Sequence, residues 1–530
     1  MEMPAWRMVL TATVCGLLWM ILHVYRVLVS NPRKIRARLE RQGVRGPRPS
    51  VIFGNIPEMK RIMQLQALKS TESESGDSLE SSLQHNWPPK IFPYYDKWSK
   101  EYGGMFIHST GNIQILYITD PALLKEVSAV KSLDLGKPTY LAKDMGALFG
   151  EGVMASNGVN WANQRKLIAP EFYLDKVKGM IGLMADSTLL MVKNWEDQVD
   201  ALGEPGVAVD IRVDQDMQNL TADVIAKASF GSSFSQGKEI FAKLRTLQSL
   251  MSMTSIFVGI PGLRHLPSEK NRHIWRLEKE VHAMILDVVK QRIATEDGEK
   301  DLLQKILEAA GKVGDAGNSL IPNSDRDKFI TDNCKNIYFA GHETTATTAS
   351  WALVLLAAHP DWQTRCRDEI RELCGDSLPD ADTLRNMKTL AMVIQETLRL
   401  YPPSTYVARE VFQDLKLKGI LLPKGVNLRI SIPVIHRNPD IWGPDVDQFR
   451  PERFAKGILG ACKVPQCYIP FGIGARTCLG QNFATVELKT VLALILRRFR
   501  FSLSPAYRHS PSFRLVIEPG QGVNLLLERA

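Results

Sequence analysis

The chain has 530 residues, of which 45% are hydrophobic and 23% charged, and this balance excludes an intrinsically disordered protein. The formal net charge is +9, but no dense Lys/Arg block lies within the body of the chain, so we expect no nucleic-acid partner. The seven cysteines are odd in number and include no CxxC pair. This count argues against a disulfide framework and for a reducing compartment.

The N-terminal segment predicts a membrane anchor in residues 1–30. Its apolar run, MVLTATVCGLLWMILHVYRVLVS, is about one membrane span long. Residues 31–50 follow as a basic, Pro-rich hinge, and the positive-inside rule keeps this flank in the cytosol. We therefore expect a single-pass protein with a cytosolic body. A cleaved signal peptide is the alternative, although no small-x-small cleavage site is evident.

Residues 51–530 are predicted to form one body that is mainly α-helical with small β-sheets. Apolar residues at helical spacing predict helices over 329–359, 390–401 and 483–501. β-branched runs between turn residues predict strands within 111–120, 415–423 and 426–433. No internal repeat is present.

Polar residues interrupt the middle of the first long helix, in the sequence AGHETT of residues 340–345. Two hydroxyls and a carboxylate in an apolar helix are costly unless they meet a polar task. Thr344 and Thr345 can donate to carbonyls one turn earlier and bend the helix. Alternatively, Glu343 and Thr344 take part in catalysis. The residues alone leave both interpretations open.

Two further pairs of residues lie within one helical turn of each other. Trp161 and Arg165 occur in WANQR, and Glu396 and Arg399 occur in ETLR. Each pair shares one helix face, so its side chains can touch. Such pairs are common, and an exposed ion pair contributes little to stability.

The sequence PFGIGARTCLG surrounds Cys478 with glycines and offers no nearby base. A thiolate can ligate a metal, attack a carbonyl or exchange disulfides. Nucleophilic attack needs a base, which would have to come from a distant segment. Ligation needs backbone N–H groups near the sulfur, and Gly472, Gly474 and Gly480 permit a tight turn beside a flat cofactor. An axial cysteine thiolate is one established way to hold haem iron.

On this motif the chain resembles the cytochrome P-450 superfamily of haem-thiolate monooxygenases. The residues that fit the pattern F-x-x-G-x-R-x-C-x-G are Phe471, Gly474, Arg476, Cys478 and Gly480. The resemblance covers nearly the whole chain and implies the cytochrome P-450 fold and haem b with Cys478 as its axial ligand. It also implies NADPH–cytochrome P-450 reductase as electron donor, because the chain carries no obvious nucleotide-binding fingerprint.

The resemblance also implies roles for the other motifs. AGHETT is similar to the oxygen-activation segment, where Thr344 would bond the iron-bound oxygen species, Glu343 would relay protons, and Gly341 would let the helix bend or pass close to haem. The expected haem-propionate contacts are Trp161, Arg165, Arg409 and Arg476. The expected buried network that holds the segment before the haem loop is Glu396, Arg399 and Arg453.

The substrate is expected to be a hydrophobic small molecule, because the segments implied to contact it are mostly apolar. The tentative contacts are Phe339, Ala340 and Thr405. Residues 41–59 and 223–241 resemble the plant branch that includes gibberellin-oxidising enzymes, which favours a terpenoid or gibberellin-like acid. The expected location is the endoplasmic reticulum membrane. The alternatives are a haem-thiolate isomerase or dehydratase that needs no external electrons, and a non-catalytic haem- or lipid-binding membrane protein.

Overall fold

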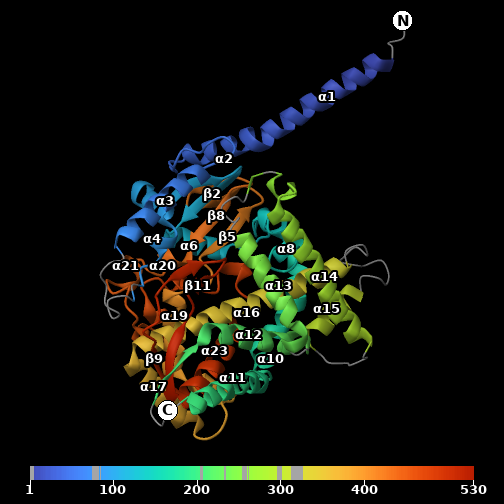
Figure 1. The fold of residues 1–530 in the computed structure, drawn as a ribbon. Helices are drawn as coiled ribbons and strands as arrows, with labels where there is room; N and C mark the ends of the chain where they lie inside the picture. Colours follow the sequence, from blue (N-terminus) through green and yellow to red (C-terminus); the bar gives the residue numbers. More distant parts are fainter. Residues whose placement is uncertain are drawn as a thin grey trace.

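The computed structural model confirms a mainly helical chain with small β-sheets (Figure 1). It describes residues 5–73, 83, 85–202, 207–231, 234–252, 259–260, 262–294, 301–311 and 326–530. The helices of more than eight residues that cover the body are α3 Ile56–Ser73, α5 Pro93–Tyr102, α6 Pro121–Ala129, α9 Gly158–Ile168, α11 Ile181–Leu202, α12 Val213–Phe230, α13 Phe234–Ser252, α14 Glu269–Ala294, α15 Leu302–Gly311, α16 Arg326–Ala358, α17 Pro360–Cys374, α19 Lys388–Leu400 and α23 Gln481–Arg498.

The N-terminal helix projects away from the rest of the molecule (Figure 1). It begins as α1 Ala5–Tyr25, continues through a π-helical turn at Arg26–Ser30, and ends as α2 Asn31–Glu40. The stretch Met8–Glu40 is the one helix in the described chain that is long and apolar enough to cross a membrane. Its most apolar window is fully exposed, as expected for a helix that packs against lipid rather than protein.

The predicted hinge, residues 31–50, is more structured than the sequence indicated. Its first ten residues form α2, because Pro32 falls in the first turn, where the missing N–H costs no helical hydrogen bond. Leu39 is completely buried. Arg36 donates to the carbonyls of Gly46 and Pro47, at 3.0 Å each. This segment therefore folds onto the body instead of forming a free linker.

A five-stranded sheet lies beside α2 and α3 (Figure 1). Its order is β1 Met105–Thr110, β2 Ile113–Ile118, β8 Asn427–Ser431, β5 Tyr406–Val411 and β3 Leu135–Gly136. Only the β2–β8 pairing is parallel within this sheet. Because side chains alternate along a strand, Leu116 and Leu428 face one core, whereas Tyr117, Ala408 and Arg429 lie in register on the opposite face.

Helix α16 runs through the middle of the helical part and is buried along most of its 33 residues. It packs most extensively on α12 and also contacts α19 and α23. The helices predicted over 329–359 and 390–401 correspond to α16 and α19. The helix predicted over 483–501 ends earlier, at Arg498, because Phe499–Leu503 pairs with the C-terminal strand as β9. The small sheets contain β4 Val209–Arg212, β12 Asn524–Arg529, β10 Pro511–Phe513, β11 Ile517–Pro519, β6 Leu415–Leu417 and β7 Ile420–Leu422.

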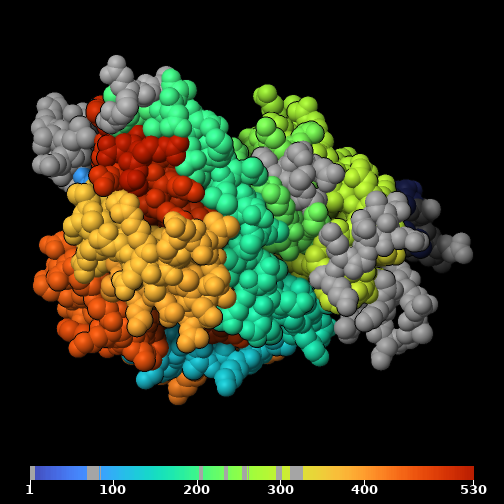
Figure 2. Space-filling model, turned by 90° about the horizontal axis from the view of Figure 1, so that it is seen from below, coloured from blue at the N-terminus to red at the C-terminus, as the bar shows by residue number. Residues whose placement is uncertain are grey.

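The face seen from below joins segments that are far apart in the sequence (Figure 2). The green-teal segment of α11, the yellow-orange segment of α17 and the red C-terminal strands lie side by side there. Arg367 of α17 donates to the carbonyl of Phe499 at 2.9 Å, and Arg529 forms an ion pair with Glu196 of α11 at 2.5 Å. These contacts close the helical part around α16 and α23.

Candidate functional site

A cavity of about 310 Å³ lies where α16, α9, β5 and the segment 470–480 meet. Cys478 lines it. Protein surrounds this side chain, yet part of its surface is accessible, so that part faces the cavity. Burial raises the pKa of the Cys478 thiol, whereas the Gly480 N–H and the cations of Arg165 and Lys137 lower it. The thiol is thus placed where a bound metal can complete its environment.

The loop before Cys478 depends on two glycines with positive φ. Gly472 has φ +80° and Gly474 has φ +66°, a region that side chains disfavour. A Cβ on Gly474 would also lie 3.0 Å from the carbonyl oxygen of Ser128. Gly480 differs from these two, because its φ of −86° is open to any residue and the backbone turn does not require a glycine there. A Cβ there would meet nothing within 4 Å, and the residue opens onto the cavity.

Cationic side chains converge on one part of the cavity wall. Arg476 donates to the carbonyl of Ser156 at 2.8 Å and lies 4.0 Å from the ring of Trp161. Arg409 donates to the carbonyl of Ile473 at 3.0 Å. Arg165 donates to the carbonyl of Thr477 at 3.0 Å. In the described chain no carboxylate pairs with these three arginines, so the wall is suited to an anionic ligand.

Lys137 joins these cations, and no sequence motif predicted its role. It lines the cavity, and burial lowers its pKa to about 7, with further lowering by Arg409 and Arg476. Burial likewise lowers the pKa of Arg409 to about 10 and that of Arg476 to about 9. Lys137 follows the short strand β3. Its place beside Cys478 results from the sheet and could not be read from spacing.

The polar segment of α16 forms another part of the cavity wall. Ala340, Gly341, Thr344 and Thr345 line the cavity. The Thr344 hydroxyl donates to the carbonyl of Ala340 at 2.7 Å, as the purely structural interpretation of AGHETT expected. The same hydroxyl oxygen still has lone pairs toward the cavity. The hydroxyl can therefore serve both the helix and a ligand.

Gly341 also lies at a helix crossing. A Cβ at this position would lie 2.5 Å from Cγ1 of Ile225, which belongs to α12. The glycine therefore permits the close approach of α12 and α16, in addition to its place in the cavity lining.

Glu343 does not line the cavity, because it projects from another side of α16. Its side chain is 1% exposed, and burial raises its pKa, whereas Arg245 and a hydrogen bond from Gln248 lower it. His342 Nε2 lies 3.3 Å from its Oε1. Burial lowers the pKa of His342 to about 3, so the imidazole is neutral and its contact with Glu343 is not an ion pair. The His342 ring packs against Phe241 of α13, between helices.

A second carboxyl beside the cavity was missed from the sequence. Glu487 lies in α23, between Ala484 and Leu488, which line the cavity. Its side chain is completely buried, and neither carboxyl oxygen has a hydrogen-bond partner in the structure. Burial raises its pKa well above the ordinary value, although the Thr345 hydroxyl of α16 lowers it, so burial favours the neutral acid. In the sequence, a single acidic residue within a mostly apolar predicted helix was the feature that could have indicated this carboxyl group.

The three tentative substrate contacts separate in space. Ala340 lines the cavity. Phe339 packs against Phe149 with a centroid distance of 5.6 Å and lies outside the lining, one helical step away from Ala340. Thr405 is buried and lies outside the lining, while its neighbours Ser404 and Tyr406 line the cavity.

The structure brings Glu396, Arg399 and Arg453 together as expected. Arg399 Nε lies 2.7 Å from Oε2 of Glu396, and Arg453 Nε lies 3.4 Å from Oε1. Arg399 also donates to the carbonyls of His436 and Val446, at 3.0 and 2.7 Å. A buried ion pair needs such extra hydrogen bonds to offset desolvation. The cluster therefore fastens α19 to the segment before the Cys478 loop.

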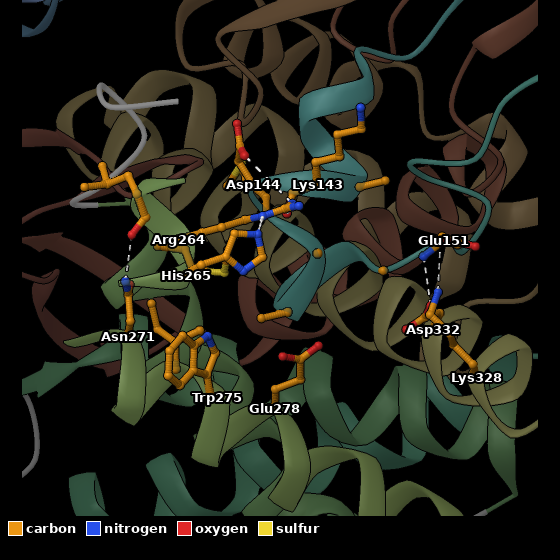
Figure 3. A pocket seen from close by; sticks show the side chains of 18 of the residues that line it. Lys143, Asp144, Glu151, Arg264, His265, Asn271, Trp275, Glu278, Lys328 and Asp332 are labelled. Atoms are coloured by element: carbon orange, nitrogen blue, oxygen red, sulfur yellow. Dashed lines mark hydrogen bonds and ion pairs between the residues drawn. The ribbon is translucent and has the colours of Figure 1, made fainter. Parts of the chain in front are cut away.

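A second cavity, of about 370 Å³, opens between α14 and the segment 142–151 (Figure 3). Charged side chains in its lining form ion pairs with one another. Lys328 lies 3.3 Å from both Glu151 and Asp332, and Arg264 lies 4.0 Å from Asp144. Its lining includes no thiol, and its charges offset one another. We therefore assign the reaction to the cavity that contains Cys478.

That cavity fits a flat iron porphyrin with two carboxylates. The Cys478 thiol can bind the metal, and the basic side chains of Arg165, Arg409, Arg476 and Lys137 can bind the carboxylates. Gly480 leaves open space in the lining. Family comparison agrees with this fit. Residues 81–523 match the family model "Cytochrome P450".

Curated plant proteins are similar over almost their full length. The chain is 50% identical over 506 residues to cytochrome P450 714C2 of Oryza sativa subsp. japonica, with 95% of each chain covered. It is 46% identical over 507 residues to cytochrome P450 714A2 of Arabidopsis thaliana, with 94% of each covered. The expected resemblance to a plant branch is confirmed. The chain belongs to the cytochrome P450 family of haem-thiolate monooxygenases.

Proposed function

We propose that this protein is a membrane-anchored monooxygenase that oxidises a hydrophobic terpenoid or gibberellin-like acid, with haem iron held by Cys478. The observation that carries the proposal is one cavity whose lining combines the Cys478 thiol, three arginines, Lys137 and the Thr344 hydroxyl of α16. When bound, haem supplies the chemistry that activates O2 and oxidises a C–H bond.

The protein's first task is to hold the thiolate form of Cys478. The Gly480 N–H donates toward the sulfur, and the cations of Arg165 and Lys137 favour its negative charge. The backbone N–H of Cys478 donates to the carbonyl of Phe471 at 2.9 Å, which fixes the loop. The environment thus offsets part of the desolvation cost of the charged sulfur.

The second task is to orient the cofactor. Arg409, Arg476, Arg165 and Lys137 supply donors for two propionates, and the Trp161 ring supports the guanidinium of Arg476. Arg409 and Arg476 are fixed in advance by backbone carbonyls, so little side-chain entropy is lost on binding. Lys137 would gain a counter-ion and regain its charge.

The third task is to deliver protons on the α16 side. Thr344 can turn its hydroxyl from the Ala340 carbonyl to an oxygen in the cavity, because Thr344 and Ala340 both line the cavity from the same helix face. We assign Glu343 to proton supply from the protein interior, through a change of its side-chain conformation. Its raised pKa suits a group that carries a proton at neutral pH.

The remaining assignments concern the membrane and the partner. The exposed apolar helix supports a single-pass anchor in the endoplasmic reticulum membrane, with residues 51–530 in the cytosol as the monooxygenase domain. Family membership implies a redox partner, and we assign this role to NADPH–cytochrome P-450 reductase. The similarity to plant relatives supports a plant small molecule as substrate.

The test uses the full-length enzyme with the reductase and NADPH. We expect a thiolate-type carbon monoxide difference spectrum, and product that carries one oxygen atom from labelled O2 in a screen of diterpenoid acids. Conversion of a lipid hydroperoxide without NADPH or reductase, with no oxygen transfer from O2, would instead identify an isomerase or dehydratase. A haem protein that never consumes NADPH with any ligand would identify a binding protein.

A further inference from the structure

Arg429 is a partly buried arginine whose charge has no counter-ion in the described part of the chain. It lies on β8, on the sheet face opposite Leu428. Its Nη1 donates to the Tyr95 hydroxyl at 2.6 Å, and its Cζ lies 4.5 Å from the ring centroid of Tyr406. The Tyr140 hydroxyl lies close enough for the Arg429 cation to lower its pKa. No carboxylate among the described residues forms an ion pair with this guanidinium.

The surrounding phenols cannot supply the missing negative charge. Burial raises the pKa of Tyr95, although Arg429 lowers it. Burial likewise raises the pKa of Tyr140 to about 12 despite Arg429. Both phenols are therefore neutral at physiological pH, whereas the guanidinium stays charged. An enclosed cation among neutral groups is costly to the fold unless an anion binds to it.

Buried arginines elsewhere in this chain have more hydrogen-bond acceptors. Arg399 has the Glu396 carboxylate and three backbone carbonyls as acceptors. Arg367 donates to two backbone carbonyls and to the Gln363 amide oxygen. Arg429 has five N–H donors, and phenol oxygens are the acceptors found for them in the described chain. Most of its donors are thus available to a ligand.

The Arg429 side chain is not fully covered by its neighbours. Protein surrounds Arg429 on all sides, yet it retains accessible surface, as Cys478 does at the haem cavity. Tyr406, whose ring Arg429 contacts, lines that cavity. Arg429 therefore stands immediately behind the cavity wall, on the side that α5, α7 Thr139–Lys143 and the sheet enclose.

We propose that Arg429, together with the hydroxyls of Tyr95 and Tyr140, binds the carboxylate of an acidic hydrophobic substrate and so directs its hydrocarbon skeleton past Tyr406 into the haem cavity. This inference rests on the proposed function and assigns recognition of the substrate's acid group to these three side chains. A carboxylate matches the planar donor fork of arginine, and phenol hydroxyls can donate to its second oxygen.

The test compares acids with their methyl esters on the full-length haem enzyme. The probes are abietic acid and gibberellic acid, each with its methyl ester, titrated through the shift of the haem absorption band. For at least one scaffold, we expect the wild-type enzyme to bind the acid about tenfold to a hundredfold more tightly than the ester, from the strength of charged hydrogen bonds. Arg429→Gln should remove that preference and leave binding of the ester unchanged. Arg385→Gln, at an exposed site on α18 Ala381–Asn386, is the matched control and should keep the preference.

Other outcomes overturn the inference. These are equal binding of acid and ester by the wild type, an undiminished preference in Arg429→Gln, or a wild-type enzyme that binds neither acid. Tyr140→Phe provides a second test if Arg429→Gln fails to bind haem. It keeps the cation and should weaken acid binding several-fold, so unchanged acid binding would also overturn the site. A purely structural arginine would affect acid and ester alike. Failure of the proposed function looks different, because the wild type would then lack the thiolate-type spectrum or NADPH-dependent turnover.

Discussion

Cys478 shows how neighbouring groups determine the chemistry of a single side chain. The chain has seven cysteines, and burial raises the pKa of the thiols of Cys334 and Cys467 among others. Cys478 alone among the cysteines in the described chain lines the cavity, where a backbone N–H and two cations act against desolvation. Its position, rather than its type, makes it the candidate ligand.

Substitution of this residue gives the most direct prediction. Cys478→Ser should abolish the thiolate-type carbon monoxide difference spectrum, because a serine hydroxyl is a far weaker donor to iron than a thiolate. Cys462→Ser, a half-buried cysteine outside the cavity, should keep the spectrum. A thiolate-type spectrum in Cys478→Ser would place the ligand elsewhere.

Thr344 carries the second prediction at the residue scale. Thr344→Ala should retain haem and raise the fraction of NADPH used without product several-fold, because it removes the hydroxyl that faces the cavity. The ratio of product formed to NADPH consumed measures this effect. Thr347→Ala, a buried threonine of the same helix outside the lining, is the control. Coupling at the wild-type ratio in Thr344→Ala would remove Thr344 from the proton path.

At the scale of elements, the packing of α12 on α16 positions the oxygen-facing wall. The two helices approach closely at Gly341, where Ile225 fills the space that a side chain would need. Thr221 of α12 also donates to the carbonyl of His342 at 3.1 Å. Any increase in volume at this crossing would move Thr344 relative to Cys478.

Gly341→Ala should therefore destabilise the protein by about 1–3 kcal/mol through overpacking. Gly182→Ala is the matched control, because Gly182 lies in α11 and a Cβ there meets nothing within 4 Å. That control should leave stability unchanged or raise it by up to about 1 kcal/mol. Thermal unfolding measures both variants, and equal Tm values would contradict the packing argument.

Buried histidines make the helical packing sensitive to acid. Burial lowers the pKa values of His342 and His436 to about 3, below the ordinary value of 6.5. Between these two values the unfolded chain binds protons that the folded chain does not. The free energy of unfolding therefore falls as the pH decreases from 6.5 toward 3, by up to about 1.4 kcal/mol per pH unit for each histidine.

His342→Phe tests this dependence, because it keeps a ring against Phe241 and removes the titrating group. The variant should lose Tm less steeply than the wild type between pH 6.5 and 4.5. His265→Phe, at an exposed site, should keep the wild-type slope. Parallel Tm curves for His342→Phe and the wild type would show that His342 does not carry the effect.

At the scale of the whole molecule, burial begins within α2, whereas the sequence predicts a body that starts at residue 51. Leu39 is 0% exposed and Val44 is 2% exposed, and both belong to the core beneath the five-stranded sheet. Arg38 also forms an ion pair with Asp414 at 2.5 Å. The end of the apolar N-terminal helix is therefore attached directly to the five-stranded sheet.

Two truncations distinguish these boundaries. Removal of residues 1–30 should leave the Tm and the haem content unchanged, because α1 makes few contacts with the body. Removal of residues 1–50 should lower the stability by about 1.5–3 kcal/mol for each of Leu39 and Val44, since their burial is lost. Equal Tm values for the two truncated proteins would restore the boundary predicted from the sequence.

Features that depend on a short run of residues were predictable. The glycine loop around Cys478, the pairing of Glu396 with Arg399 and the helices α16 and α19 all follow from local spacing. The direction of side chains on those elements was harder. Glu343, Phe339 and Thr405 were placed at the cavity because their neighbours belong there, yet one step along a helix or strand turns a side chain away.

The sequence by itself determined the family, the glycine loop around Cys478 and the apolar N-terminal helix, because each is written in consecutive residues whose spacing suffices. The tertiary structure decided which side chains share a wall. Lys137, Glu487 and Arg429 come from distant segments and meet the cavity or its border because of the sheet register and the crossing of α23 with α16. The fold shifts the pKa values of these groups because it removes them from water, and burial of that kind is a property of three-dimensional packing.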